Sequence, residues 1–419
     1  MAKEGSWIVV GQIATVLGAL VLVRVLTEHL EPTQYGQLAL GLTVAGLVNQ
    51  IVMGGVTAGI GRFYSIATEK NDLPGYLHAS IQMMGYATVV VVVIALVLMA
   101  GLLWLGYSQW MGLAAAALVL SVLSGYNSSL SGIQNAARQR AIVAIHSGLG
   151  AWLKVLLAVG VMLWLGNSST AVVLGYVMSS LLVTVSQLLF LRRLISAQSG
   201  KRHTSANWGR QMWVYSWPFM AWGIFGWAQQ SSGRWALEVY STTTDVGLYT
   251  VVFQLGYSPI IMAIGLTMTF FMPILFARAG DASSAVRNEG VRKLISKMVL
   301  LGGGLTVIAV LVTSLLHSQI FNLLVNEKYF LVSYLLPWVI LSGGLFGISQ
   351  VLASQLMVFN MTLTLSYASI GSSVIGIAAS IVCVKAFSLD GMIVASLIHS
   401  TAYFLFVISV LGKNNKAMK

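Results

Sequence analysis

Long apolar stretches separated by short polar segments run through this chain from one end to the other. Twelve of them are long enough, at about 20 residues each, to cross the apolar core of a bilayer as helices. They cover residues 6–27, 36–60, 76–103, 111–134, 142–165, 171–191, 213–237, 247–275, 298–317, 333–357, 365–384 and 391–411. The pattern therefore predicts an all-α, polytopic membrane protein of about twelve transmembrane helices.

The composition agrees with this class. Hydrophobic residues make up 57% of the chain and charged residues only 8%, whereas soluble domains have about 25% charged residues. The single cysteine, Cys383, lies in an apolar run and excludes a disulfide framework or a cysteine metal site. No small-residue cleavage site follows the first polar residues, so we expect 6–27 to be a retained span.

The positive charges are distributed unevenly between the connections. If the N-terminus is inside, 18 of the 23 Lys and Arg lie in inner segments, and the outer loops hold only Lys328 and Lys385. Short loops rich in Lys and Arg stay in the cytoplasm, which predicts that both termini are cytoplasmic. A net charge of +12 could also suit nucleic acid. Because the basic residues flank spans in short loops, we expect no nucleic-acid partner.

The longest mid-chain connection, 192–212, is polar and basic and contains Gly and Ser. We interpret it as a cytoplasmic linker between an N-terminal six-helix lobe, 1–191, and a C-terminal six-helix lobe, 213–419. A weak repeat favours this division. Arg24-x-x-x-Glu28 recurs 210 residues later as Arg234-x-x-x-Glu238, and the following Gly36 recurs after 211 residues as Gly247. Repeated halves are a common design of transporters.

Three basic residues lie inside predicted spans, and no acidic residue lies near a span centre. Lys154 lies near the middle of its span, where a charge costs about 2.5–3.5 kcal/mol on insertion scales. It should therefore face a wet cavity or an anion, or else pair with a polar group of a neighbouring helix. The other two, Arg24 and Arg234, lie nearer the outer face and can extend toward the interface.

Each of these arginines has a glutamate one turn later, Glu28 or Glu238, on the same helix face. A structural interpretation is a pair of helix-end ion pairs. A functional interpretation is that each guanidinium lies at the outer mouth of a cavity and binds phosphate through paired N–H donors. The three span cations Arg24, Lys154 and Arg234 are accordingly the candidate substrate-binding residues.

Other polar residues give weaker signals. Arg62 follows a glycine-rich helix end and could contact a phosphate at the inner mouth or simply anchor the topology. His399 lies mid-span and could titrate, or hydrogen-bond to a neighbouring helix. Trp222 and Trp227 could stack on sugar rings or pack in the protein, while Trp208, Trp213 and Trp217 suit interfacial anchoring. The deep amides could join helices or line a hydrated lumen: Gln12, Asn49, Gln50, Asn127, Gln187, Gln229, Gln230, Gln350 and Gln355.

Several stretches resemble the superfamily of multidrug, oligosaccharidyl-lipid and polysaccharide exporters (MOP). They are the first outer hairpin from Leu22 to Leu38, then Gly54–Tyr64, Gly233–Tyr249 and Phe271–Phe276. The match is closest to the polysaccharide branch, the O-antigen type flippases of undecaprenyl-linked sugar units. This branch often has an Asp-Arg pair at the end of the seventh span, where this chain has Gly233-Arg234. Glu238 could supply the missing acid.

The resemblance implies two six-helix lobes around a central cationic cavity, working by alternating access. It implies a transporter, not an enzyme, that moves an undecaprenyl-pyrophosphate-linked oligosaccharide outward across a bacterial inner membrane for polysaccharide or lipopolysaccharide synthesis. Membrane lipids and other polysaccharide-assembly proteins are the expected partners, and no cofactor or metal is expected. Glu28, Glu238 and His399 are the candidates for coupling or gating.

Two other functions fit parts of the sequence. An ion-coupled multidrug exporter has the same architecture, but cation antiport usually uses carboxylates within the membrane. A membrane polysaccharide polymerase or ligase needs a catalytic surface outside the membrane, for which the predicted outer loops are short. No P-loop, HExxH or GxSxG motif indicates catalysis. A non-transporting scaffold in an assembly complex is a third alternative.

Overall fold

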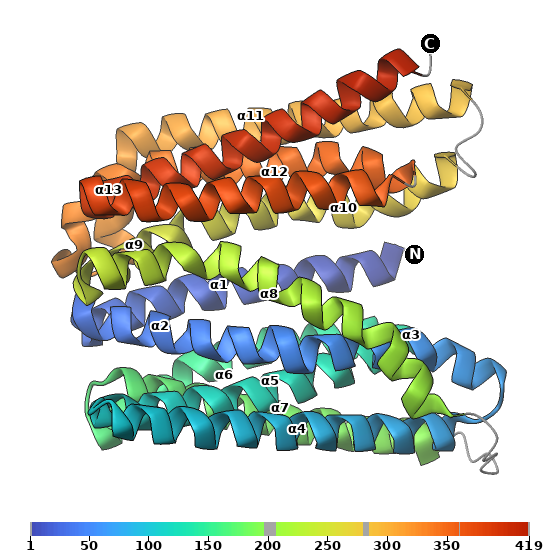
Figure 1. Cartoon of the computed structure of the whole chain (residues 1–419), viewed down its shortest axis with the longest axis horizontal. Helices are drawn as coiled ribbons and strands as arrows, with labels where there is room; N and C mark the ends of the chain where they lie inside the picture. Colours follow the sequence, from blue (N-terminus) through green and yellow to red (C-terminus); the bar gives the residue numbers. More distant parts are fainter. Residues whose placement is uncertain (1, 197–206, 280–284, 360, 418–419) are drawn as a thin grey trace. The chain divides into compact units, whose positions relative to one another are not determined.

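The computed structural model describes residues 2–196, 207–279, 285–359 and 361–417, and its regular elements in these ranges are all helices. The all-α prediction is confirmed. In chain order the α-helices (Figure 1) are α1 (Ala2–His29), α2 (Pro32–Val48), α3 (Gly54–Glu69), α4 (Leu73–Trp104), α5 (Met111–Ala136), α6 (Arg140–Leu165), α7 (Ser169–Ser196), α8 (Trp208–Tyr240), α9 (Thr243–Leu255), α10 (Tyr257–Ala279), α11 (Ala285–Leu324), α12 (Leu336–Val358) and α13 (Thr362–Ala417).

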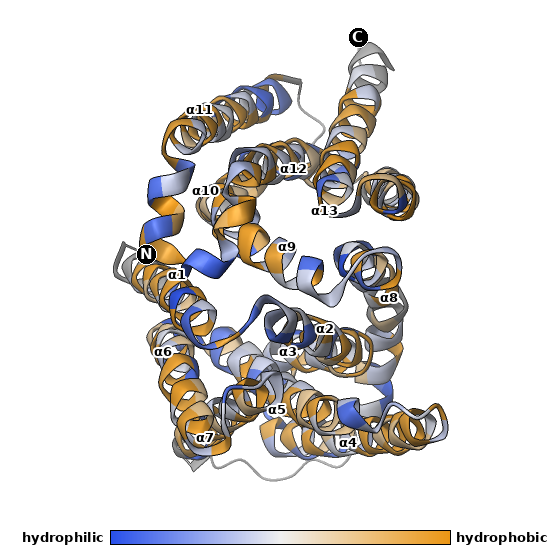
Figure 2. Cartoon of the chain, turned by 90° about the vertical axis from the view of Figure 1, so that its left-hand side faces the viewer, coloured by the Kyte–Doolittle hydropathy of each residue, from blue (hydrophilic) through white to orange (hydrophobic). Residues whose placement is uncertain are grey.

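Three short elements join these helices. A π-helical turn, Asn49–Met53, makes α2 and α3 one continuous span, and 3₁₀ turns at Ser108–Trp110 and Glu327–Leu335 lead into α5 and α12. In the described part of the chain, ten helical segments are long and apolar enough to cross a membrane. Figure 2 shows why: α4 is coloured hydrophobic along most of its length, and the hydrophilic residues of α11 gather at one end.

The predicted spans correspond to these segments once two details are included. The last segment, 364–412, contains non-helical backbone at Phe387 and Ser388, which separates the two predicted spans 365–384 and 391–411. After this break, the Cα atom of Gly391 packs so closely on the Cys383 carbonyl oxygen that a Cβ atom would overlap it. The predicted span 213–237 lies within α8, which is not among the ten. With these two additions the helices account for twelve spans.

Local sequence explains where several helices begin and end. The Asp72 carboxylate accepts a hydrogen bond from the Gly75 N–H at 3.2 Å and caps the start of α4. Thr242 likewise accepts from the Asp245 N–H at 3.1 Å at the start of α9. Each cap satisfies a backbone donor that has no partner within the helix. Gly166, with φ of +88°, follows the last residue of α6 in a conformation that favours glycine.

Contacts divide the chain into two compact units. The first unit comprises 1–30 and 37–228, and the second comprises 31–36 and 229–419. The division therefore falls inside α8, and the start of α2 groups with the second unit. The predicted linker at 192–212 includes residues 197–206, which lie outside the described residues. The division of the sequence at that linker stays a prediction.

Small residues bring helices of the first unit close together. In this unit α6 packs between α1 and α7, and α5 packs between α7 and α3. A Cβ atom at Gly11 or Gly18 of α1 would lie within about 3 Å of Ala144 or Ala151 of α6, so that the backbones approach closely. Gly55 and Gly59 of α3 do the same against α8. The glycine-rich start of α3 therefore allows close packing against α8.

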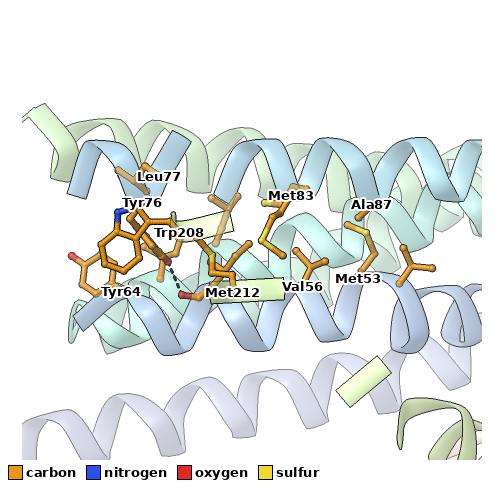
Figure 3. Packing of buried hydrophobic residues seen from close by; sticks show 14 of the residues in the cluster. Met53, Val56, Tyr64, Tyr76, Leu77, Met83, Ala87, Trp208 and Met212 are labelled. Carbon is orange, nitrogen blue, oxygen red and sulfur yellow. Dashed lines mark hydrogen bonds between the residues drawn. The ribbon is translucent and has the colours of Figure 1, made fainter. Parts of the chain in front are cut away.

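A hydrophobic cluster of the first unit packs α3, α4 and α5 against the start of α8 (Figure 3). Tyr76 is fully buried in it and donates a hydrogen bond from its hydroxyl to the Ile60 carbonyl oxygen at 2.6 Å. Trp208 is only 2% exposed, and its indole N–H donates to the Asp72 carboxylate at 2.8 Å. Trp208 is therefore a core residue rather than the interfacial anchor that we predicted, whereas Trp213 and Trp217 are exposed.

The second unit is built around α12, which packs against α10, α11 and α13. The side chain of Thr306 from α11 packs closely against Gly344 of α12, and that of Ile264 from α10 packs against Gly347. The hydroxyls of Ser342 and Ser400 hydrogen-bond at 3.0 Å and join α12 to α13. With α12 mostly buried, its neighbours carry the exposed apolar faces that suit contact with lipid.

The starts of α2 and α9 contact each other within the second unit, and the contact follows the sequence repeat. The hydroxyl oxygens of Thr33 and Thr244, which are 211 residues apart, lie 2.8 Å from each other. A Cβ atom at Gly36 would overlap the carbonyl oxygen of Thr243, and one at Gly247 would overlap that of Pro32. Residues that are 211 positions apart in the sequence repeat thus contact each other. Each glycine leaves room for the start of the helix in the other repeat.

Candidate functional site

Lys154 lies on α6 of the first unit and is half-buried. Its ammonium group is 5.8 Å from the centroid of the Tyr176 ring on α7, a distance at which the ring quadrupole attracts a cation. Within the described residues, no carboxylate lies at ion-pair distance from Lys154. The neighbour found for Lys154 is thus an aromatic ring of the adjacent helix, and its predicted contact with a wet cavity or an anion stays a prediction.

Arg24 lies on α1, also in the first unit. One of its terminal nitrogens is 3.1 Å from the Glu28 carboxylate, and the two side chains are 39% and 50% exposed. The predicted i,i+4 ion pair is confirmed here. An ion pair this exposed contributes little to stability. It nevertheless means that the Arg24 guanidinium already has a carboxylate partner.

Arg234 lies on α8 in the second unit, and its surroundings differ. Its guanidinium carbon is 5.3 Å from the centroid of the Phe253 ring, and its Nε–H donates to the Thr250 hydroxyl at 3.3 Å. Within the described residues it has no carboxylate at ion-pair distance. The predicted Arg234–Glu238 ion pair is wrong.

The reason is that α9 supplies other partners for both side chains. The Thr243 hydroxyl donates to one Glu238 oxygen at 3.0 Å, and the second oxygen is buried with no hydrogen-bond partner among the described residues. Thr250 and Phe253 contact the arginine instead. Glu238 therefore does not replace the acid that precedes the arginine in the resembling flippases.

Arg62 is exposed on α3. Its neighbour Phe63 lines a groove of about 650 Å³ in the first unit, together with Arg210 and Tyr215 of α8. The position of Arg62 is compatible with an anion contact or with topology anchoring, so its predicted phosphate contact stays a prediction.

Three of the deep amides join helices. Asn49 donates to the Ser121 carbonyl at 3.1 Å, Asn127 to the Ser180 carbonyl at 3.2 Å, and Gln187 to the Ser131 hydroxyl at 2.9 Å. Trp227 donates to the Thr43 carbonyl at 2.7 Å and holds α8 against α2. The side chain of Trp222 lies outside the described residues. These contacts favour helix packing over a hydrated lumen for this part of the first unit.

Gln229 and Gln230 behave differently, because they line a cavity of about 470 Å³ inside the second unit. Its lining residues belong to α8, α9, α10, α12 and α13. Its size is typical of small-molecule sites. Two of its lining residues, Gln230 and Ser258, are exposed.

A ladder of aromatic rings forms one wall of this cavity. Ring centroids are separated by 5.7 Å between Tyr249 and Phe253, 4.5 Å between Phe253 and Tyr257, and 6.3 Å between Tyr257 and Phe346. Sequence reasoning missed these residues. The signal was present, since Tyr249, Phe253 and Tyr257 recur every four residues and therefore fall on one helix face.

His399 completes the wall on α13. Its Nδ1 is 3.0 Å from the Ser372 carbonyl oxygen, which can only accept, so that Nδ1 carries the proton. Its Nε2 then accepts from the Gln229 amide nitrogen at 2.8 Å. His399 is thus a hydrogen-bonded link between α13 and α8, as the structural interpretation of this residue predicted. A role in coupling or gating stays a prediction, as it does for Glu28 and Glu238.

The predicted site residues are therefore divided between the units, with Arg24 and Lys154 in the first and Arg234 in the second. In the described part of the chain, no group of three His, Cys, Asp or Glu side chains could hold a metal ion. What the geometry offers in each unit is a cation beside an aromatic ring, and in the second unit also a polar, aromatic cavity.

A family model and several solved structures match this chain. A family model described as polysaccharide biosynthesis protein matches residues 1–278. A search of curated proteins finds no match. A solved structure of the lipid II flippase MurJ, in an inward closed conformation, is similar with a TM-score of 0.73 and 10% identity, over 98% of this chain and 88% of that one.

Two structures of a multidrug resistance MATE family transporter of the MOP superfamily are also similar. The inward-facing one has a TM-score of 0.69 and 13% identity, over 97% of this chain and 96% of that chain. The outward-facing one has a TM-score of 0.63 and 12% identity, over 99% and 97%. At these identities the structures establish a shared fold. Because the family model covers more than half of the sequence, this multi-pass membrane chain belongs to the polysaccharide biosynthesis protein family.

Proposed function

We propose that this protein is a flippase that moves an undecaprenyl-pyrophosphate-linked oligosaccharide from the inner to the outer leaflet by alternating access. Its membership of a polysaccharide biosynthesis family and its fold, shared with a lipid II flippase, support this class of substrate. The lipid tail would stay in the bilayer while the charged head group and the sugars cross on the protein. No catalytic step is needed for this movement.

The main support for the proposal is the surroundings of two cations within the spans. Lys154 and Arg234 contact aromatic rings and, within the described residues, no carboxylate. A cation in a membrane span without an acid is costly unless an anion or water offsets its charge. A pyrophosphate is an anion that would offset such a charge. Arg24, which shares its charge with Glu28, would make a weaker contact.

The topology of the proposal follows the charge pattern. If both termini lie on the cytoplasmic side of a bacterial inner membrane, Arg62 lies on the side from which the substrate enters. It could contact the head group of the substrate there. Polysaccharide or O-antigen repeat units of lipopolysaccharide are the expected cargo, and polysaccharide-assembly proteins would receive them on the outer side. Glu28, Glu238 and His399 are the side chains through which proton coupling would be tested.

A reconstituted flipping assay tests the function. Purified protein in proteoliposomes is given a fluorescent undecaprenyl-pyrophosphate sugar, and its transfer between leaflets is measured for the wild type and for Lys154→Ala. The wild type should flip the lipid, and Lys154→Ala should slow it about tenfold, as expected for loss of one charged contact. Lys293→Ala is the matched control, because Lys293 is exposed on α11 and its nearest acid, Glu289, is 3.8 Å away.

The alternatives give other results. Dye efflux without lipid flipping would identify a multidrug exporter, and incorporation of labelled sugar into polymer would identify a polymerase or ligase. No flipping of several different glycans by folded wild-type protein would overturn the proposal.

A further inference from the structure

We propose that the cavity of the second unit is a saccharide-binding site, which takes a neutral sugar ring of the transported unit. The cavity is lined by residues of α8, α9, α10, α12 and α13, all within the second unit. The inference rests on the proposed function, because it assigns the sugar part of the cargo to a defined set of residues. It goes beyond that function because the cavity contains none of the span cations.

The aromatic ladder suits the apolar face of a pyranose ring. Tyr257 and Phe253 stack on each other at 4.5 Å with an angle of 19° between their planes, so the ring surface open to a ligand is the part that lines the cavity. Phe346, which also lines it, lies 6.3 Å from Tyr257. Each pyranose presents C–H groups on a ring face, which pack on an aromatic π-face, while its hydroxyls project from the edge. Side chains with a large flat surface and few rotatable bonds lose little entropy when they bind in this way.

A sugar also needs hydrogen bonds to its hydroxyl groups, and polar side chains in the same cavity can form them. Gln230 and Ser258 line it and are exposed to an entering ligand. Gln229 also lines it, and its amide nitrogen is oriented by His399 at 2.8 Å. An amide has both donors and an acceptor, so it can bind the donor and the acceptor of neighbouring hydroxyls together. Gln229 therefore enters binding with its orientation already set.

The charge of the lining decides between ligand classes. None of the described residues that line the cavity is Asp, Glu, Lys or Arg. A phosphate would lack a cation there, and a cationic drug would lack the carboxylate that such sites in membranes use. A neutral polar ligand with an apolar face fits the lining, and a sugar ring has both properties.

Phe253 connects the cavity to the proposed phosphate contact. Its ring lines the cavity, stacks with Tyr257 and also lies 5.3 Å from the Arg234 guanidinium carbon. In a lipid-linked saccharide the first sugar is bonded directly to the pyrophosphate. A sugar on the aromatic ladder would therefore place the attached phosphate next to Arg234.

Ligand-observed saturation-transfer NMR on the full-length detergent-purified protein tests this site directly. The probes are free methyl pyranosides of common hexoses and N-acetylhexosamines, which have neither lipid nor phosphate. The wild type should transfer saturation to the ring protons of at least one of them. Phe346→Ala, which removes a ring of the ladder, and Gln230→Leu, which removes exposed hydrogen-bonding groups, should each weaken binding about tenfold. Phe276→Ala, an exposed aromatic of α10 outside the cavity, should not.

Flipping measured on the same variants separates the two proposals. Saccharide binding that is lost in Phe346→Ala and Gln230→Leu supports the site even if the wild type flips no lipid, and in that case only the proposed function falls. Lipid flipping without saccharide binding, or with binding unchanged in both variants, overturns the site and leaves the function. Correct folding of Gln230→Leu is expected, since its side chain is exposed, so a loss there cannot be attributed to a collapsed core.

Discussion

Arg24 and Arg234 have the same place in the sequence repeat, and the structure gives them different partners. Arg24 forms an exposed ion pair with Glu28 at 3.1 Å, whereas Arg234 lies over Phe253 and donates to Thr250. The spacing of four residues to a glutamate is identical in both halves. Spacing alone permits an ion pair, but the neighbouring helix decides whether it forms.

In the second half that helix is α9. Thr243 donates to Glu238 at 3.0 Å, and the aromatic face of α9 receives the guanidinium. The partners of Arg234 are therefore a ring quadrupole and a hydroxyl, which are weaker partners than a carboxylate. An arginine in this state retains much of its attraction for an incoming phosphate. Under the proposed function, we therefore expect Arg234 to make a stronger contact with the substrate than Arg24.

The largest effect is expected at the contact between the two repeats. Gly36→Ala and Gly247→Ala each place a methyl group on a backbone carbonyl oxygen of the other repeat, which forces the two helix starts apart. We expect each to lower the free energy of unfolding by about 3 kcal/mol or more, at the upper end for overpacked cores. Denaturant titration in detergent measures it. Gly303→Ala on α11 is the control, because nothing lies within 4 Å of its Cβ position, and an equal loss there would contradict this account.

A double-mutant cycle between Arg234 and Phe253 should give the next largest value. Arg234→Met and Phe253→Leu, alone and together, isolate the contact between guanidinium and ring. A partly desolvated cation–π contact should give a coupling energy of about 1 kcal/mol. Phe253→Tyr keeps the ring and should keep the coupling. A coupling energy indistinguishable from zero would show that the Phe253 ring does not stabilise the Arg234 guanidinium.

The cycle between Arg24 and Glu28 should give a smaller value. Arg24→Met and Glu28→Gln break an exposed i,i+4 pair, so that we expect a coupling energy of about 0.3–0.5 kcal/mol. Screening predicts that this coupling falls further as the salt concentration rises. Coupling above that of Arg234 with Phe253, or coupling that salt does not change, would reverse the ranking of the two motifs.

The smallest effect is expected between Arg234 and Glu238. The two side chains form no ion pair, and Glu238 accepts from Thr243. The cycle of Arg234→Met with Glu238→Gln should therefore give a coupling energy near zero. A coupling as large as that of Arg24 with Glu28 would show that the two motifs are equivalent after all.

The sequence was sufficient for the fold because the signals for spans are local. Hydrophobic length predicted the helices, and even the break at Phe387 and Ser388 fell between two predicted spans. The repeat offset of 211 also proved informative, since Thr33 and Thr244 are in contact.

The site was less predictable because it depends on contacts between helices. Lys154 and Arg234 could be chosen as span cations, but their ring partners come from other helices. Trp208 looked like an interfacial anchor, although it is buried on Asp72. The cavity combines residues from five helices, so only the four-residue spacing of its aromatics was visible in the sequence.

The most direct measurement compares Arg234→Gln with Arg24→Gln in proteoliposomes, using a fluorescent undecaprenyl-pyrophosphate sugar and equal amounts of folded protein. A hydrogen bond to a charged group is worth about 1.5–3 kcal/mol, so Arg234→Gln should slow flipping about tenfold or more. Arg24→Gln, which removes a guanidinium already shared with Glu28, should change the rate by no more than about twofold, within the range of an exposed ion pair. Equal loss in both variants, or a larger loss in Arg24→Gln, would contradict the assignment of the stronger phosphate contact to Arg234.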